Sequence, residues 1–186
     1  MYNISLVLEQ LNHVESGEHC ILIYPNLATL REIYTQYYKK MLLKKEMVLF
    51  LLEGYESNDL ISDYLTTSGI DVIQNIGNGS LVLASSLKKF FSSESLFVEF
   101  LDVVRGDIDR MGNKNGMTII TDGGSYCSST ENMTSLIDFE SFISSIVDIK
   151  PVKLLCLYNR DDFNILTEKQ KQILVQLHSK KLLVES

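Results

Sequence analysis

Residue types that often stabilise small folds or mark special sites are scarce in this sequence. Its 186 residues include no tryptophan, two prolines and three cysteines. Because the cysteines are odd in number and never form a CxxC pair, they predict no disulfide framework. Cys20 and Cys156 lie inside apolar runs, whereas Cys127 lies in a serine-rich stretch. We therefore expect Cys20 and Cys156 to be small buried apolar side chains.

The sequence also lacks an excess of positive charge and a long hydrophobic run. There are 17 lysines and arginines against 24 acidic residues, a net charge of −7, which argues against direct nucleic-acid binding. The longest strictly apolar run, Met47–Leu52, has six residues, whereas a membrane-spanning helix needs about 20. No basic segment precedes the apolar N-terminal stretch, as it would in a signal peptide. We therefore expect a soluble cytoplasmic domain with no membrane partner.

Short apolar runs alternate with segments of helical periodicity along the whole chain. Strands are expected, in chain order, at 19–24, 47–52, 71–76, 81–84, 117–121, 152–158 and 182–184. Helices are expected at about 3–14, 27–42, 57–67, 95–111, 133–147 and 168–177. This alternation predicts βαβ units, and therefore one α/β domain over residues 1–186. Its architecture is a three-layer sandwich with a mostly parallel central sheet and an N-terminal amphipathic helix.

Polar residues suited to capping precede several of the expected helices. A side-chain oxygen at such a position can accept a hydrogen bond from a free N–H in the first helical turn. The candidates are Asn26, Ser57, the pair Ser128 and Glu131, and the pair Thr167 and Gln170; both pairs have the spacing of a capping box.

Open parallel sheets bind ligands at the carboxyl ends of their strands, and one common ligand class is excluded here. A phosphate-binding loop needs glycines for backbone wrapping and a lysine for the phosphates. The first strand-to-helix turn, YPNLATL, has neither. The run Met117–Asp122 resembles a Walker B strand, but without the loop its aspartate would have no nucleotide-bound metal to hold. We therefore predict no ATP hydrolysis and no cofactor.

Catalytic and metal-binding motifs are missing as well. The three histidines, His13, His19 and His178, form no HxH or HExxH pattern and no His/Cys cluster, and GxSxG is absent. The sequence therefore predicts no metal site and no catalytic residues.

Several segments, taken in order, carry a family resemblance. They are GEHCILIYPN (17–26), EMVLFLL (46–52), GIDV (69–72), GSLVLAS (79–85) and CLYNRDDF (156–163), followed by His178. From about residue 15 onward the chain resembles the MEDS domain, the sensory domain of methanogen and methylotroph regulators. The resemblance implies a RecA/KaiC-like fold without its phosphate loop, and a sensor that binds a small ligand. Two positions depart from the family pattern: Ile119 and Gly123–Gly124 stand where an Arg and a Glu are common, and Lys45 stands in place of a glycine.

Motif order and strand-end placement together predict a ligand site at the carboxyl ends of the strands. The expected lining residues are His19, Tyr24, Glu53, Asp122, Tyr158 and Arg160. Arg160 is the natural contact for an anion, because a guanidinium group matches carboxylate or phosphate geometry. The resemblance further implies a role in signal transduction or transcriptional regulation, with output through a separate regulator or kinase.

Two other hypotheses belong to different functional classes. The chain could be a structural or interaction protein that acts through homo-oligomers, since RecA-like domains assemble side by side. It could instead be a small enzyme in which Glu53 or Asp122 acts as general base. A large solution mass without an occupied pocket would favour the first hypothesis, and a pocket without either carboxylate would exclude the second.

Overall fold

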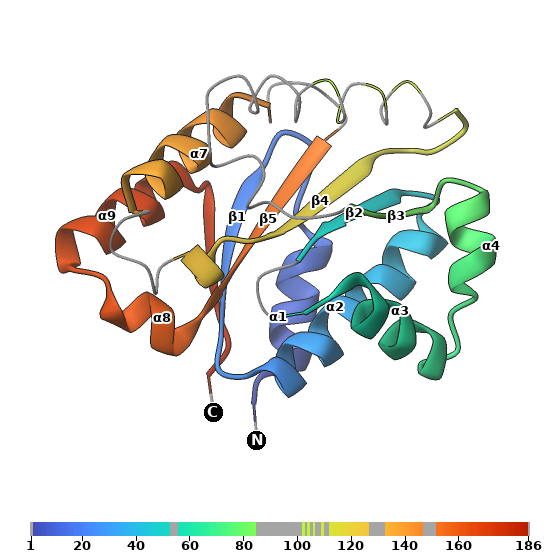
Figure 1. The fold of residues 1–186 in the computed structure, drawn as a ribbon, viewed down its shortest axis with the longest axis horizontal. Helices are drawn as coiled ribbons and strands as arrows, with labels where there is room; N and C mark the ends of the chain where they lie inside the picture. Colours follow the sequence, from blue (N-terminus) through green and yellow to red (C-terminus); the bar gives the residue numbers. More distant parts are fainter. Residues whose placement is uncertain are drawn as a thin grey trace.

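The computed structural model contains a central sheet of six strands, all of them parallel (Figure 1). It describes residues 2–52, 56–84, 112–126, 133–146 and 152–185, together with positions 102, 104, 106 and 109. The strands are β1 (His19–Tyr24), β2 (Met47–Leu51), β3 (Leu81–Leu83), β4 (Met117–Asp122), β5 (Val152–Asn159) and β6 (Lys180–Leu183). Their spatial order is β3-β2-β4-β5-β1-β6. The inner strands are nearly continuous apolar runs because both of their faces are covered.

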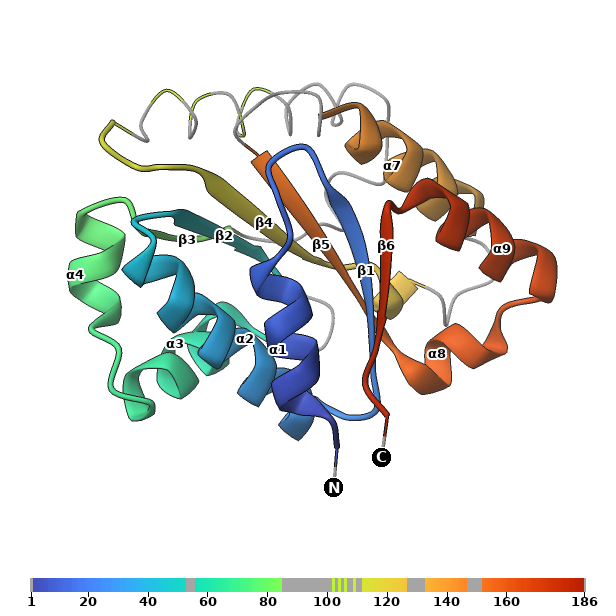
Figure 2. The ribbon, with the colours of Figure 1, turned by 180° about the vertical axis from the view of Figure 1, so that it is seen from behind.

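Helices cover the two faces of the sheet, which makes the three layers (Figures 1 and 2). One face packs against α1 (Ile4–Asn12), α2 (Leu27–Leu43) and α3 (Asn58–Thr67). The other face packs against α7 (Met133–Ile146), α8 (Arg160–Ile165) and α9 (Glu168–Leu177). A short helix α4 (Val72–Gly77) precedes β3, and a 3-10 turn, η1 (Gly124–Tyr126), follows β4. None of the described helices has the length and apolar character needed to cross a membrane.

The predicted fold class is therefore confirmed, and so are three of the predicted helix starts. The side chains of Asn26, Ser57 and Thr167 each accept a hydrogen bond from a backbone N–H in the first turn of the helix that follows. Thr167 and Gln170 form a complete capping box. The Ser128–Glu131 pair and most of the predicted helix 95–111 lie outside the described residues.

One predicted strand, 71–76, is wrong, because this segment forms α4. Asp71 caps the helix by accepting a hydrogen bond from the N–H of Gln74 at 2.9 Å. Only Val72 is buried, whereas Ile73 is 86% exposed and Ile76 is 49% exposed. An apolar pair followed by another apolar residue three positions later fits a short helix as well as a strand, and the aspartate cap decides in favour of the helix.

Strand pleating distributes the predicted site residues between the two faces, because successive side chains point in opposite directions. His19, Cys156 and Tyr158 face α7 and α9, where Cys156 pairs in register with Ile21 and Tyr158 with Ile23. Tyr24 faces the α1–α2 layer. Asp122 follows Thr121, whose hydroxyl contacts Cys156, so Asp122 also points toward the α1–α2 layer.

Candidate functional site

The structure does not bring the six predicted site residues into one group. His19 opens β1 and Tyr24 ends it, so they lie roughly 16 Å apart along the strand at the usual rise of about 3.3 Å per residue. Tyr24 and Asp122 are at the carboxyl edge as predicted, and both are buried. Arg160 is the first residue of α8 and donates a hydrogen bond from Nη2 to the carbonyl oxygen of Val184. Glu53 lies outside the described residues.

Two of the predicted residues, His19 and Tyr158, do meet, because both contact Glu140 on α7. The hydroxyl of Tyr158 donates to Oε1 of this carboxylate at 2.5 Å, and Nε2 of His19 lies 3.2 Å from Oε2. Gly123 leaves room for this arrangement, since an added Cβ would lie 2.7 Å from the Tyr158 hydroxyl. The contact belongs to a larger polar cluster under α7 and α9.

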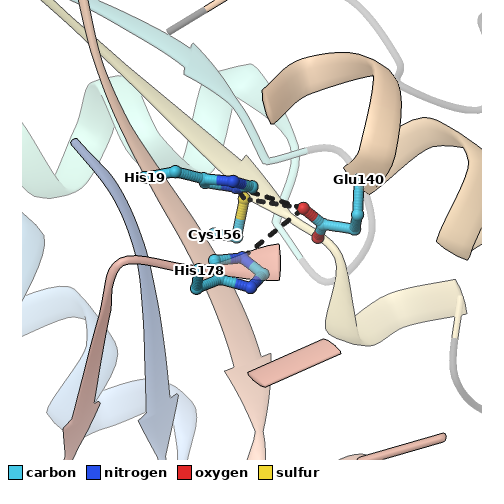
Figure 3. Close-up of side chains that lie close together, drawn as sticks. All are labelled: His19, Glu140, Cys156 and His178. Atoms are coloured by element: carbon cyan, nitrogen blue, oxygen red, sulfur yellow. Dashed lines mark hydrogen bonds and ion pairs between the residues drawn. The ribbon is translucent and has the colours of Figure 1, made fainter. Parts of the chain in front are cut away.

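This cluster consists of His19, Glu140, Cys156 and His178, which point toward one another in Figure 3. They come from the start of β1, the middle of α7, the middle of β5 and the residue that follows α9. Glu140 and Cys156 are completely buried, and His19 and His178 are 4% and 8% exposed. One donor atom from each residue lies within 4.8 Å of the other three.

The side-chain N, O and S atoms that face one another inside the cluster lie at or near hydrogen-bonding distance. Nε2 of His19 lies 3.1 Å from Sγ of Cys156. Oε2 of Glu140 lies 3.2 Å from Nε2 of His19, 3.3 Å from Sγ of Cys156 and 3.5 Å from Nε2 of His178. The two imidazole rings have centroids 3.9 Å apart.

Hydrogen bonds on the outer side hold each of these groups in place. Nδ1 of His19 lies 2.8 Å from the hydroxyl of Ser144, and Nδ1 of His178 lies 2.6 Å from the carbonyl oxygen of Leu174. The hydroxyl of Thr121 donates to Sγ of Cys156 at 3.2 Å. Together with the Tyr158 bond to Glu140, every member of the cluster has an outer partner.

Burial and mutual contact shape the electrostatics of the cluster. Burial alone would raise the pKa of Glu140, but the hydrogen bonds and positive charge available from His178 and His19 lower it below its usual range. Burial lowers the pKa of His19, against the opposing effect of Glu140. Burial, and then the charge of Glu140, raise the pKa of the Cys156 thiol well above its usual value. Cys156 is therefore a poor nucleophile, and its chemistry is that of a buried metal ligand or hydrogen-bonding group.

The carboxyl edge has a different, acidic character. Asp122 is buried and accepts a hydrogen bond from the N–H of Ser125 at 3.3 Å. Burial, reinforced by the charge of Glu56, raises the pKa of Asp122 to about 7. Burial, and then the charges of Asp122, Asp162 and Glu56, raise the pKa of Tyr24. Three carboxyl groups thus act on one tyrosine at the edge where a ligand was expected.

Sequence reasoning missed most of the cluster. The expectation that the histidines and cysteines form no cluster is corrected by the structure, because His19, Cys156 and His178 converge from distant parts of the chain. The expectation that Cys156 is buried is confirmed, but its neighbours are polar. A signal existed for these three, since all belong to the motifs that carry the family resemblance. Glu140 carried no signal of its own.

A comparison with known protein families identifies the family of this chain. The family model of the MEDS domain (MEthanogen/methylotroph, DcmR Sensory domain) matches residues 18–170. The chain belongs to the MEDS family. This MEDS domain is therefore a sensory domain, which is the part of a signalling module that receives the signal. Three of the four cluster residues lie within the match, and His178 follows it. No curated protein matches the sequence significantly.

Solved structures share the fold of this MEDS domain at low sequence identity. An uncharacterized protein from Pyrococcus horikoshii, solved with an unknown peptide, has a TM-score of 0.69 at 14% identity, covering 96% of this chain and 82% of that one. A KaiC-like protein from Pyrococcus horikoshii OT3 has a TM-score of 0.65 at 12% identity, covering 90% and 71%. The flagellar accessory protein FlaH from Methanocaldococcus jannaschii has a TM-score of 0.63 at 12% identity, covering 92% and 73%. The fold is therefore RecA/KaiC-like.

Proposed function

We propose that this domain is a non-catalytic sensor that binds a small ligand, uncharged or cationic, at the carboxyl edge of its sheet. The observation that carries the proposal is the group of three carboxyl side chains, Asp122, Asp162 and Glu56, that surround Tyr24 electrostatically. Signal output then passes to a separate regulator or kinase. That partner, the cytoplasmic location and self-association stay predictions.

The turn after β1 supports the absence of nucleotide chemistry. Only Pro25 and Asn26 separate β1 from α2. The first turn of α2 would be an anion site in a nucleotide-binding relative of this fold, because helix N-termini attract phosphate groups. Here the side chain of Asn26 accepts the hydrogen bond from the N–H of Thr29 at 3.0 Å. The side chain of Asn26 therefore already engages one of the N–H groups that would otherwise be free to bind a phosphate oxygen.

The charges at this edge also argue against a nucleotide or another anionic ligand. The carboxyl groups of Asp122, Asp162 and Glu56 all raise the pKa of Tyr24. A polyphosphate or carboxylate ligand would add further negative charge to this carboxyl-rich edge, which is unfavourable. The guanidinium group of Arg160, which was expected to contact an anion, donates a hydrogen bond from Nη2 to the Val184 carbonyl. A small alcohol or amine, which can donate hydrogen bonds to carboxyl groups, suits this edge better than an anion.

Calorimetric titration tests the proposal. Magnesium-ATP, small alcohols, small amines and small carboxylates are titrated into the purified chain, and ATP turnover is measured in parallel. We expect heat with an alcohol or amine, lost in Asp122→Asn and retained in the control Glu15→Gln, an exposed carboxylate before β1. ATP that binds and turns over, or a panel without any binding, would overturn the proposal.

A further inference from the structure

We propose that His19, Glu140, Cys156 and His178 form a closed binding site for one Zn²⁺ ion. The ligand atoms are Nε2 of both histidines, Sγ of Cys156 and Oε2 of Glu140. This inference does not depend on the ligand-binding function proposed above, because the cluster lies under α7 and α9 and not around Tyr24.

The spacing of the four atoms fits a tetrahedral zinc ion. Zinc binds nitrogen, oxygen and sulfur at about 2.0–2.3 Å, so its ligand atoms lie about 3.3–3.8 Å apart. Four of the six separations here are 3.1, 3.2, 3.3 and 3.5 Å, and all six are within 4.8 Å. A closer approach of the His178 ring to the other three ligand atoms would complete the tetrahedron.

The outer hydrogen bonds give both histidines the tautomer that a metal requires. The carbonyl oxygen of Leu174 can only accept, so Nδ1 of His178 carries the proton that it donates. The hydroxyl of Ser144 donates to the carbonyl oxygen of Glu140 at 2.9 Å, so its oxygen is free to accept from Nδ1 of His19. In neutral rings, both Nε2 atoms then present lone pairs toward the centre. Such outer-sphere bonds are typical of histidine ligands to metals.

The other two ligands have outer partners of the same kind. Thr121 donates to the sulfur of Cys156, and Tyr158 donates to Oε1 of Glu140, leaving Oε2 for the centre. Hydrogen bonds that donate to a thiolate and to the far oxygen of a carboxylate stabilise the charged forms that bind metals.

Without a cation between the four side chains, the position of the His178 ring has no explanation. Nε2 of His178 is buried and lies 3.5 Å from Oε2 of Glu140, a separation that is long for a hydrogen bond. A proton shared between these groups would satisfy one pair of atoms, whereas a divalent cation satisfies all four. With Cys156 as thiolate and Glu140 ionised, the charge of the site is 2 − 1 − 1 = 0, so burial of the loaded site has a low electrostatic cost.

The ligand set selects the class of metal and its role. Two imidazoles and a thiolate suit zinc and disfavour Mg²⁺ and Ca²⁺, which prefer oxygen ligands. Four protein ligands in a buried site leave no open position for water or substrate, which is typical of a structural zinc site. The ion would join β1, β5, α7 and the segment between α9 and β6.

Metal analysis of the untagged, purified chain tests the proposal. We expect about one zinc ion per chain, as a four-ligand structural site requires. After removal of zinc, titration with Co²⁺ should give the thiolate-to-cobalt absorption band and the strong visible bands of tetrahedral cobalt. Cys156→Ser should abolish the thiolate band, and His178→Gln should weaken binding of Co²⁺ at least tenfold.

Matched variants on other parts of the molecule serve as controls. Cys20→Ser removes the other described buried cysteine, which faces the α1–α2 layer, and His13→Gln removes the histidine outside the cluster. Both should keep the zinc content and the cobalt spectrum of the parent chain. Where Cys156→Ser does not fold, the spectrum of the parent chain decides. A folded parent chain that contains no zinc and gives no thiolate-to-cobalt band would overturn the site and leave a hydrogen-bonded cluster, whatever the result with alcohols and amines.

Discussion

On the α7–α9 face of the sheet, four side chains from separate elements converge on one point, whereas two of the polar contacts buried on the α1–α2 face are simple pairs. The hydroxyl of Tyr37 contacts that of Thr118 at 3.2 Å, and Nζ of Lys153 lies 2.7 Å from Oε2 of Glu46. Each of these contacts joins only two side chains. The cluster is instead held by outer partners while its inner atoms crowd together, which is the arrangement of a binding site.

The comparison predicts its largest effect at Glu140. In Glu140→Ala, the paired histidines lose their carboxylate, and Tyr158 loses its acceptor in a fully buried setting. Removal of one partner of a buried charged pair typically costs about 3–5 kcal/mol. Urea unfolding should therefore give a free energy of unfolding lower by that amount. Glu140→Gln, which removes the charge but keeps an acceptor for Tyr158, should lose less; a Gln variant as stable as the parent chain would mean that the carboxylate charge has no role.

A pH-dependent effect is expected at Asp122, on the opposite face. Burial raises the pKa of this carboxyl to about 7 in the folded chain, whereas the ordinary pKa of an aspartate is 3.8. Between these values the native state binds more protons, so the contribution of Asp122 to stability falls as the pH rises and levels off above pH 7. The full effect is on the order of 4 kcal/mol.

Asp122→Asn removes this titration while keeping the size of the side chain. Its stability relative to the parent chain should therefore increase from about pH 4 to pH 7 and then stay constant. Urea unfolding of both chains across this range gives the difference directly. A stability difference between the two chains that does not change with pH would contradict a buried Asp122 with a raised pKa.

Local and long-range features of the molecule differ in how far sequence could predict them. Helix starts at Asn26, Ser57 and Thr167 depend on hydrogen bonds within three residues, so the local pattern was sufficient. The segment at 71–76 was misassigned because its three apolar residues fit both periodicities and the cap at Asp71 was not considered. The family resemblance supplied the RecA/KaiC-like relation, whereas periodicity supplied only the layered parallel sheet.

Local sequence patterns could not predict the cluster, because its formation depends on the order of the strands in the sheet and on how α7 and α9 pack against it. Strands β1 and β5 are neighbours only through the order β4-β5-β1-β6, which brings His19 and Cys156 onto one face. Glu140 joins them because α7 packs over that face, and His178 because α9 ends there. No spacing rule for metal ligands spans positions 19, 140, 156 and 178. At the carboxyl edge, by contrast, the ends of the strands could be located directly from the apolar runs.

The smallest expected effect compares one tyrosine from each face. Tyr158→Phe removes a hydrogen bond to a buried carboxylate, and Tyr37→Phe removes a hydrogen bond to the hydroxyl of Thr118. Bonds to charged groups contribute about 1.5–3 kcal/mol to stability, and bonds between neutral groups about 0.5–1.5 kcal/mol. The free energy of unfolding should thus fall by about 1 kcal/mol more in Tyr158→Phe. Both variants keep the buried ring, so urea unfolding compares the bonds alone; equal losses, or a larger loss at Tyr37, would mean that Glu140 is not ionised in the folded chain.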